Sequence, residues 1–142
     1  MIAVDTSVLV DLLGGDASGD AAETCLRDAL SKGPVVVCDI VVSEVVAGLG
    51  HGSWLIDTLD EVGIGYAPLE LRSAVRAGEM QRRYNERRST AGRGPAANEP
   101  IRTVPDFLIG AHALMQCDAL ITRDAGFFRD YFKGLKIITP KA

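Results

Sequence analysis

The sequence predicts an α/β fold built on a mainly parallel sheet of five strands. Five short apolar runs rich in β-branched residues alternate with longer segments of helical periodicity, and this alternation is typical of βαβ units with right-handed crossovers. The chain of 142 residues has the length of one ordinary domain, and its composition, 47% hydrophobic and 24% charged, is that of a globular protein. We therefore expect residues 1–142 to form a single domain.

The expected elements follow one another along the whole chain. The strands are the brief β-branched runs Ile2–Asp5, Val35–Cys38, Ile64–Ala67, Ala119–Thr122 and Lys136–Ile138. The helices are the periodic segments between them, Ser7–Leu13, Asp20–Ser31, Ile40–Leu49, Ser53–Val62, Leu71–Arg88 and Pro105–Cys117, with a short turn at Phe127–Phe132.

Local signals set several of the expected boundaries. Asp39 and Ser53 each precede a helical run and are the expected N-caps, and Gly63 follows a helix as its C-terminal glycine. Gly110 is small enough to let its helix approach the sheet closely. The segment Ser89–Thr103 is rich in Gly, Pro and Ala without periodicity, so we expect a mobile loop there.

The overall charge hides a strong asymmetry. The net charge is −4, but residues 1–70 carry 12 acids and 2 bases, whereas residues 71–105 carry 3 acids and 8 arginines. Such a division suits a cation and a phosphate backbone at neighbouring places. The apolar start has no basic region before it and is interrupted by Asp5 and Asp11, so we do not expect it to be an export signal.

Other features favour a cytoplasmic protein with no membrane span. Asp39 and Glu44 break the longest apolar stretch, which falls short of the roughly 18 residues that a membrane helix needs. The three cysteines are odd in number and lack zinc-ligand spacing, so we expect reduced, buried thiols.

Four acidic residues lie where expected strands give way to helices: Asp5, Glu44, Asp106 and Asp124. Ligands bind where the carboxyl ends of parallel strands meet. At about 5 Å and an effective dielectric near 20, each like-charged pair costs roughly 3 kcal/mol. Converging carboxylates would therefore hold a divalent cation, and hard oxygen ligands suit Mg²⁺ or Mn²⁺. The chemistry indicated is phosphodiester hydrolysis by metal-activated water.

A simpler reading exists for each acid taken singly. Aspartate is favoured near a helix N-terminus because it caps free N–H groups and meets the positive end of the helix dipole, which would account for Asp124 or Asp39. Glu44 fits this reading worst, because it is embedded in the apolar run VVSEVVAG and has no cap to form.

On these residues the chain resembles the PIN-domain ribonucleases, and within them the VapC-like toxins of toxin–antitoxin pairs. The matching segments, in chain order, are Asp5-Thr6-Ser7 after the opening strand, Glu44 on the helix after the second strand, Pro105-Asp106 opening the helix DFLIGAHAL, and Thr122-Arg123-Asp124 before Gly126-Phe127-Phe128. The resemblance covers nearly the whole chain. It departs from the usual pattern in the length of the Ser89–Thr103 loop.

The resemblance implies a three-layer α/β/α sandwich and a Mg²⁺- or Mn²⁺-dependent endoribonuclease. It also implies a homodimer, an RNA substrate and a cognate antitoxin whose C-terminal segment covers the active groove. By matching position, the expected metal ligands are Asp5 and Asp106, the expected catalytic acids are these two with Glu44 and Asp124, and the expected supporting hydroxyls are Ser7 and Thr122.

An arginine-rich segment is the candidate for RNA contact, because arginine binds phosphates independently of sequence. Its members are Arg82, Arg83, Arg87, Arg88 and Arg93. A solvated helix face and an acidic antitoxin surface are the open alternatives. His112 should point away from Asp106, and His51 lies in a Gly-His-Gly loop, so neither is expected to act in catalysis. The aromatic residues expected in the core or an interface are Trp54, Tyr84, Phe127 and Phe128.

Two other functional classes would require residues that this sequence lacks, and a third stays open. A receiver-type signalling domain would need an aspartate at the end of the third strand, where Ala67-Pro68 stand instead. A haloacid dehalogenase-type phosphatase would need D-x-D after the first strand, where the sequence reads Asp5-Thr6-Ser7. A catalytically weak module that only binds RNA or an antitoxin stays open, and measured turnover separates it from an enzyme.

Overall fold

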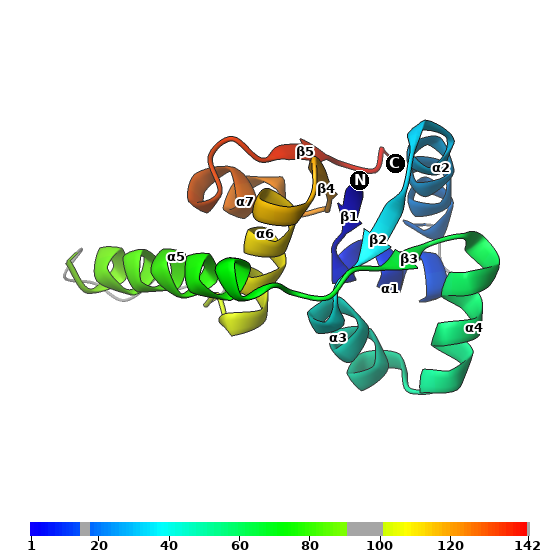
Figure 1. The fold of residues 1–142 in the computed structure, drawn as a ribbon, viewed down its shortest axis with the longest axis horizontal. Helices are drawn as coiled ribbons and strands as arrows, with labels where there is room; N and C mark the ends of the chain where they lie inside the picture. The colour runs from blue at the N-terminus through cyan, green and yellow to red at the C-terminus, as the bar shows by residue number, and fades with distance from the viewer. Residues whose placement is uncertain (15–17, 91–100, 142) are drawn as a thin grey trace.

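The structure, a computed structural model, describes residues 1–14, 18–90 and 101–141. Five strands form one sheet in the order β3-β2-β1-β4-β5, and every neighbouring pair is parallel (Figure 1). The strands are β1 (Ile2–Val4), β2 (Val35–Val37), β3 (Gly65–Tyr66), β4 (Ala119–Ile121) and β5 (Lys136–Ile138). The expected parallel sheet and the order of its elements are confirmed.

Seven helices of the described residues connect and cover the strands. They are α1 (Thr6–Gly14), α2 (Ser18–Lys32), α3 (Asp39–Leu49), α4 (Gly52–Val62), α5 (Leu71–Thr90), α6 (Val104–Gln116) and α7 (Ala125–Tyr131). Within these ranges, no helix combines the length and the apolar composition that crossing a bilayer would require.

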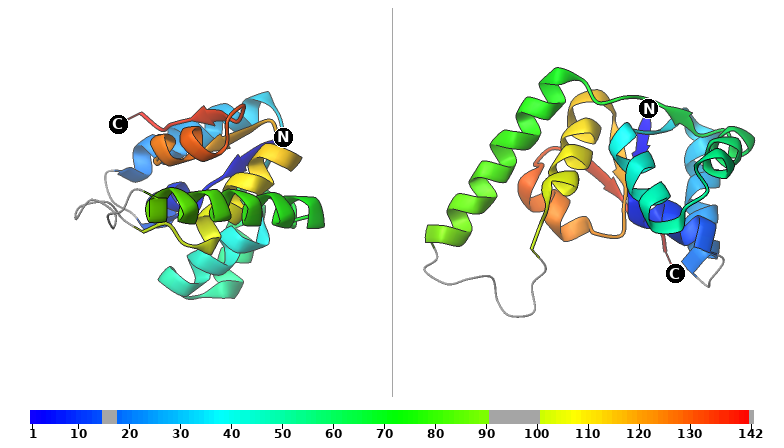
Figure 2. Two further views of the ribbon diagram at one scale, coloured as in Figure 1. Left: turned by 90° about the vertical axis from the view of Figure 1, so that its left-hand side faces the viewer. Right: turned by 90° about the horizontal axis from the view of Figure 1, so that it is seen from below.

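The sheet is the middle layer of a three-layer α/β/α sandwich. Figure 1 shows α6 and α7 on one side of the strands and α2 on the other. The right-hand view of Figure 2 shows α5 beside α6, as an outer helix of the first side. Because helices cover both faces, the central strands are apolar throughout, and all three residues of β2 and of β4 are buried.

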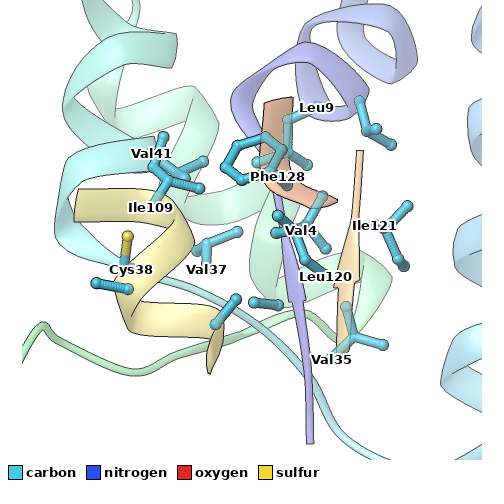
Figure 3. Close-up of a cluster of buried hydrophobic side chains, with 14 of the residues drawn as sticks. Val4, Leu9, Val35, Val37, Cys38, Val41, Ile109, Leu120, Ile121 and Phe128 are labelled. Carbon is cyan, nitrogen blue, oxygen red and sulfur yellow. The ribbon is translucent and has the colours of Figure 1, made fainter. Parts of the chain in front are cut away.

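The core lies between these layers. Ala3 of β1 is in register with Val36 and with Leu120, so the apolar side chains of three strands stack side by side. Figure 3 shows Val4, Leu120 and other strand residues meeting side chains from the covering helices. Phe107, Phe128 and Phe132 are the largest of the fully buried side chains and fill the space between α6, α7 and the sheet.

Some expected boundaries differ from those observed. Asp39 is the first residue of α3, with Cys38 as N-cap, and its Oδ1 instead accepts the Leu69 N–H at 3.1 Å. The N-cap of α4 is His51, in the left-handed region at φ 57°, rather than Ser53. Gly63 is the C-cap of α4, as expected, with φ 85°.

The segment Ser89–Thr103 is only partly a loop. Helix α5 continues to Thr90, and the expectation of mobility for residues 91–100 falls outside the described residues. Residues 101–103 lead directly into α6.

Gly110 is required at a close contact, although its partner is not the sheet. A Cβ at this position would lie 2.4–2.7 Å from three ring atoms of Phe132, which is itself buried against Phe127 and Phe128. A side chain at this position would therefore displace the Phe132 ring.

We predict that Gly110→Ala lowers the free energy of unfolding by about 1–3 kcal/mol, because the Phe132 ring must move within a packed core. Gly78→Ala is the matched control, since a Cβ at that exposed helical position meets nothing within 4 Å and should stabilise by about 0.5–1 kcal/mol. Urea denaturation of both variants measures the difference. Equal stability of Gly110→Ala and the unmodified protein would contradict the packing described.

Candidate acidic site at the edge of the sheet

The sheet reverses its strand order between β1 and β4, and this is where an open parallel sheet forms its ligand crevice. Asp5 directly follows β1, and Thr122 directly follows β4. The Asp5 N–H donates to the Ile121 carbonyl at 2.9 Å, so the two strand ends are held together. Because β1 is the central strand of five and borders β4, Asp5 at the end of β1 lies at this crevice.

The Asp5 carboxylate is nearly buried and accepts hydrogen bonds from neutral groups. The Thr122 hydroxyl donates to Oδ2 at 2.6 Å, the Ser7 hydroxyl donates to Oδ2 at 3.2 Å, and the Thr6 N–H donates to Oδ1 at 2.8 Å. The residue is only 9% exposed. Ser7 and Thr122 thus both donate to Asp5, and their supporting role in a site stays a prediction.

Burial raises the pKa of Asp5 above its ordinary value, although the hydrogen bonds from Thr122, Thr6 and Ser7 act to lower it. The negative charge of Asp106 raises this pKa further. Among the described residues, no lysine or arginine forms an ion pair with Asp5. The site therefore disfavours the charged form of Asp5 unless a cation is supplied from outside the protein.

Glu44 reaches the same place through Thr6. The Thr6 hydroxyl donates to Glu44 Oε1 at 2.7 Å, while the Thr6 N–H donates to Asp5. Glu44 lies on α3, which packs against α1, and its side chain is half-buried in an otherwise apolar helix. One threonine therefore connects the first two acids.

Asp106 lies in the first turn of α6 and is oriented by the start of that helix. Its Oδ2 accepts the Thr103 N–H at 3.1 Å, and Pro105 precedes it in the same turn. Asp106 is close enough to Asp5 for its charge to raise the pKa of that residue. Thr6 thus links Asp5 to Glu44, and Asp106 acts on Asp5 through its charge, while a joint role of the three acids stays a prediction.

Asp124 differs from the other three acids because it has a cationic partner. Its carboxylate is ion-paired with the Arg102 guanidinium, and its N–H donates to the Thr122 hydroxyl at 3.0 Å. Asp124 is adjacent to the site through Thr122, but its charge is already balanced within the chain.

Other candidate residues lie away from the acids or serve the core. His112 is buried, its Nε2 lies 2.8 Å from the Ala67 carbonyl oxygen, and burial lowers its pKa, as suits a neutral core histidine. Tyr84, Phe127 and Phe128 are buried in an aromatic cluster, whereas Trp54 is 47% exposed.

The arginines of α5 are not equivalent. Arg82 is exposed and paired with Glu86, Arg83 is exposed, Arg87 lies over the Tyr131 ring at 5.3 Å and Arg88 over the Tyr84 ring at 5.5 Å. Arg93 lies outside the described residues.

Sequence reasoning missed Thr6 and Arg102. Thr6 directly follows Asp5 in the Asp5-Thr6-Ser7 motif, and this position was the signal that its hydroxyl could contact a neighbouring acid such as Glu44. Arg102 stands four residues before Asp106, in a segment without periodicity, so only its nearness to that acid could have marked it.

The donor set fits a hard divalent cation with few protein ligands. Within residues 1–14, 18–90 and 101–141, no three acidic, histidine or cysteine side chains lie together as a ready metal cluster. Mg²⁺, however, is usually bound through one or two carboxylates, with waters and substrate phosphates completing its shell. A buried carboxylate without an ion-pair partner, beside a second carboxylate, is the arrangement that such a cation would stabilise.

Comparisons with known proteins agree with this architecture. A family model for the PIN domain matches residues 2–133. VapBC2 from Rickettsia felis, solved with a DNA fragment from its promoter, is similar with a TM-score of 0.68 and 17% identity, over 99% of this chain and 100% of that chain. FitAcB from Neisseria gonorrhoeae is similar with a TM-score of 0.65 and 19% identity, over 99% and 98% of the two chains.

A further solved relative is a toxin by its own description. VapC20 from Mycobacterium tuberculosis, described as cleaving the sarcin–ricin loop, is similar with a TM-score of 0.60 and 20% identity, over 92% of this chain and 94% of that chain. No curated protein matches the chain by sequence. At these identities the structural likeness establishes the fold.

The raised pKa of Asp5 predicts how the metal-free protein responds to pH. Between the ordinary value of 3.8 and the raised folded value, the folded state binds more protons than the unfolded state. The free energy of unfolding should therefore fall as pH rises through this window, measured by urea denaturation in EDTA.

Asp5→Asn should remove this loss, because the amide carries no charge to desolvate. The exposed Asp57→Asn is the matched control and should keep the pH dependence of the unmodified protein. A pH dependence that survives Asp5→Asn unchanged would show that another group causes it.

Proposed function

Because this chain belongs to the PIN domain family, we propose that it is a metal-dependent endoribonuclease and the toxin of a toxin–antitoxin pair. The observation that carries the proposal is the buried Asp5 carboxylate. It accepts hydrogen bonds from neutral donors, and the negative charge of Asp106 raises its pKa. The receiver-type alternative does not fit, because the strand order of a receiver is 2-1-3-4-5 and the order here is 3-2-1-4-5.

Asp5 and Asp106 are the proposed ligands of Mg²⁺ or Mn²⁺. When bound, the cation would lower the pKa of water and balance the charge that develops on the phosphate. Thr122, Ser7 and Thr6 hold the Asp5 carboxylate in one orientation. Such fixed hydrogen bonds preorganise the ligand, so less reorganisation is needed when the substrate arrives.

Glu44 is the proposed proton acceptor for the attacking water. It is half-buried, it is oriented by the Thr6 hydroxyl, and it has no ion-pair partner among the described residues. Asp124, the other carboxylate expected to act in catalysis, is instead ion-paired with Arg102.

Asp5→Asn and Asp106→Asn should each abolish RNA cleavage while preserving the fold, because each removes one charge that the cation requires. The assay is incubation of total RNA with and without Mn²⁺, followed by mapping of the fragment ends. Asp57→Asn is the control, since that exposed carboxylate on α4 is outside the site.

A second measurement separates metal binding from catalysis. Saturating Mg²⁺ should raise the thermal unfolding midpoint of the unmodified protein and of Asp57→Asn, because a ligand of the folded state stabilises it by mass action. The midpoints of Asp5→Asn and Asp106→Asn should not respond. Cleavage retained by either variant would refute the assignment, and a fold that binds Mg²⁺ without turnover would favour the weak binding module.

The arginine-bearing end of α5 is the proposed contact for the RNA backbone. Arg83 and Arg87 are exposed there, and the helix lies alongside α6, whose first turn carries Asp106 (Figure 2). Substitution of Arg87 and Arg88 together by Ala should reduce the dependence of RNA affinity on salt, measured by fluorescence anisotropy. Identical salt dependence in the double variant would assign these arginines to packing on Tyr131 and Tyr84 alone.

The proposed partners follow from the solved relatives, several of which are toxin–antitoxin complexes. An apolar groove of about 410 Å³ between α1, α2 and α4 could seat an antitoxin segment, with Leu12, Leu13 and Leu26 in its lining. The proposal also includes a homodimer. Leu71 and Val75, spaced one helical turn apart on α5, are 83% and 57% exposed and would suit an interface. The proposal places the protein in the cytoplasm.

A further inference from the structure

Arg102 lies beside the acidic site without belonging to the arginine-rich segment of α5. It is followed by Thr103, whose N–H donates to Asp106, so its backbone adjoins one proposed metal ligand. Its guanidinium is ion-paired with Asp124, whose own N–H donates to the Thr122 hydroxyl that also holds Asp5. Arg102 is therefore connected to Asp106 through the backbone of Thr103, and to Asp5 through Asp124 and Thr122.

The Arg102 side chain is held in one place by several contacts. The guanidinium lies over the Phe127 ring at 4.5 Å, and the side chain is only 22% exposed. The backbone N–H of Arg102 donates to the Tyr84 hydroxyl at 2.9 Å, which fixes the backbone at this residue. A cation fixed in this way has already lost most of its rotamer freedom, so ordering it on a ligand costs little further entropy.

Most donors of this guanidinium have no acceptor within residues 1–14, 18–90 and 101–141. An arginine has five N–H donors, and within the described residues only the Nη1 group of Arg102 bonds to an acceptor, Asp124. The sole side-chain nitrogen or oxygen in those residues that is both buried and without a partner is Arg88 Nε. The free donors of Arg102 are therefore open to solvent.

We infer that Arg102 binds a phosphate of the RNA strand at the acidic site, and that Asp124 is the positioning residue that orients it. The inference deepens the proposed function and rests on it. A planar guanidinium offers parallel N–H donors that match phosphate oxygens, and it is more weakly hydrated than an ammonium group. Asp5, Glu44 and Asp106 would repel an incoming polyanion, and Arg102 offers N–H donors beside them that can bind a phosphate oxygen.

The contacts of Arg102 set it apart from other arginines of the chain. Arg27 on α2 is also paired with a carboxylate, Glu23, but both side chains are well exposed, and α2 lies on the other side of the sheet from α6. Arg27→Ala removes the same charge and the same kind of ion pair as Arg102→Ala, so it is the matched control.

The experiment measures binding of a fluorescein-labelled single-stranded RNA oligonucleotide to the full chain in EDTA, by anisotropy, over a range of salt concentrations. Arg102→Ala should bind about tenfold more weakly or worse, as expected for loss of one charge-assisted contact. The slope of log affinity against log salt should fall by about 0.7, the value for one phosphate contact on a single strand. Arg27→Ala should change neither quantity.

Two further variants separate phosphate binding from a structural role. Arg102→Lys should keep the salt slope, because the charge remains, but should cleave more slowly in single-turnover assays, because the planar fork is lost. Asp124→Asn should also keep the slope and slow cleavage, while the Mn²⁺ concentration for half-maximal rate stays unchanged. A merely structural role of Arg102 would shift the unfolding midpoint of Arg102→Ala and leave the slope as it is.

The possible results distinguish this inference from the function on which it rests. An unmodified protein that cuts no RNA with Mg²⁺ or Mn²⁺ contradicts the proposed function. If the unmodified protein cuts RNA and Arg102→Ala binds with the same affinity and slope, only the assignment of Arg102 is overturned. A raised Mn²⁺ requirement in Asp124→Asn would make Asp124 a metal ligand and overturn its assignment as the positioning residue.

Discussion

The burial of one carboxylate without an ion-pair partner is the constraint on which the rest of the site depends. Asp5 must end the central strand of the sheet, where strand order reverses, and it must do so under cover of α1, α6 and the segment after β4. The surrounding hydroxyls and N–H groups reduce the cost of burial without removing it, and Asp106 adds to that cost. The fold thus maintains a position that is unfavourable for the protein alone and favourable for a bound cation.

The energetic cost of burying Asp5 relates the stability of the fold to its proposed function. A fully packed apolar residue in place of Asp5 would remove a buried charge, and the chain instead supplies three hydrogen bonds to keep the carboxylate in a fixed orientation. The neighbouring charges are arranged differently. Asp124 is balanced by Arg102, and the exposed Arg123 pairs at 2.7 Å with Asp11, which is itself buried, so the segment after β4 is anchored on two sides. Net negative charge therefore remains concentrated on Asp5, Glu44 and Asp106.

Much of the fold was predictable from the sequence because periodicity and apolar runs report burial directly. The bounds of β5 agree with the prediction, and those of most helices differ by one or two residues. The predicted N-caps of α3 and α4 were wrong because backbone angles decide them, and the Asp39 carboxylate instead accepts the Leu69 N–H. A shared site for Asp5, Glu44 and Asp106 was predicted from strand order, and it stays a prediction. The pairing of Asp124 with Arg102 could not be predicted from the sequence, since it joins a segment without periodicity to a distant turn.

The most direct test of the central claim is an anomalous difference map from crystals of the protein soaked in Mn²⁺. A peak in contact with the carboxylates of both Asp5 and Asp106, absent from crystals of Asp5→Asn, is the result that this account predicts. No peak at saturating Mn²⁺, or a peak bound elsewhere with Asp5 untouched, would contradict it.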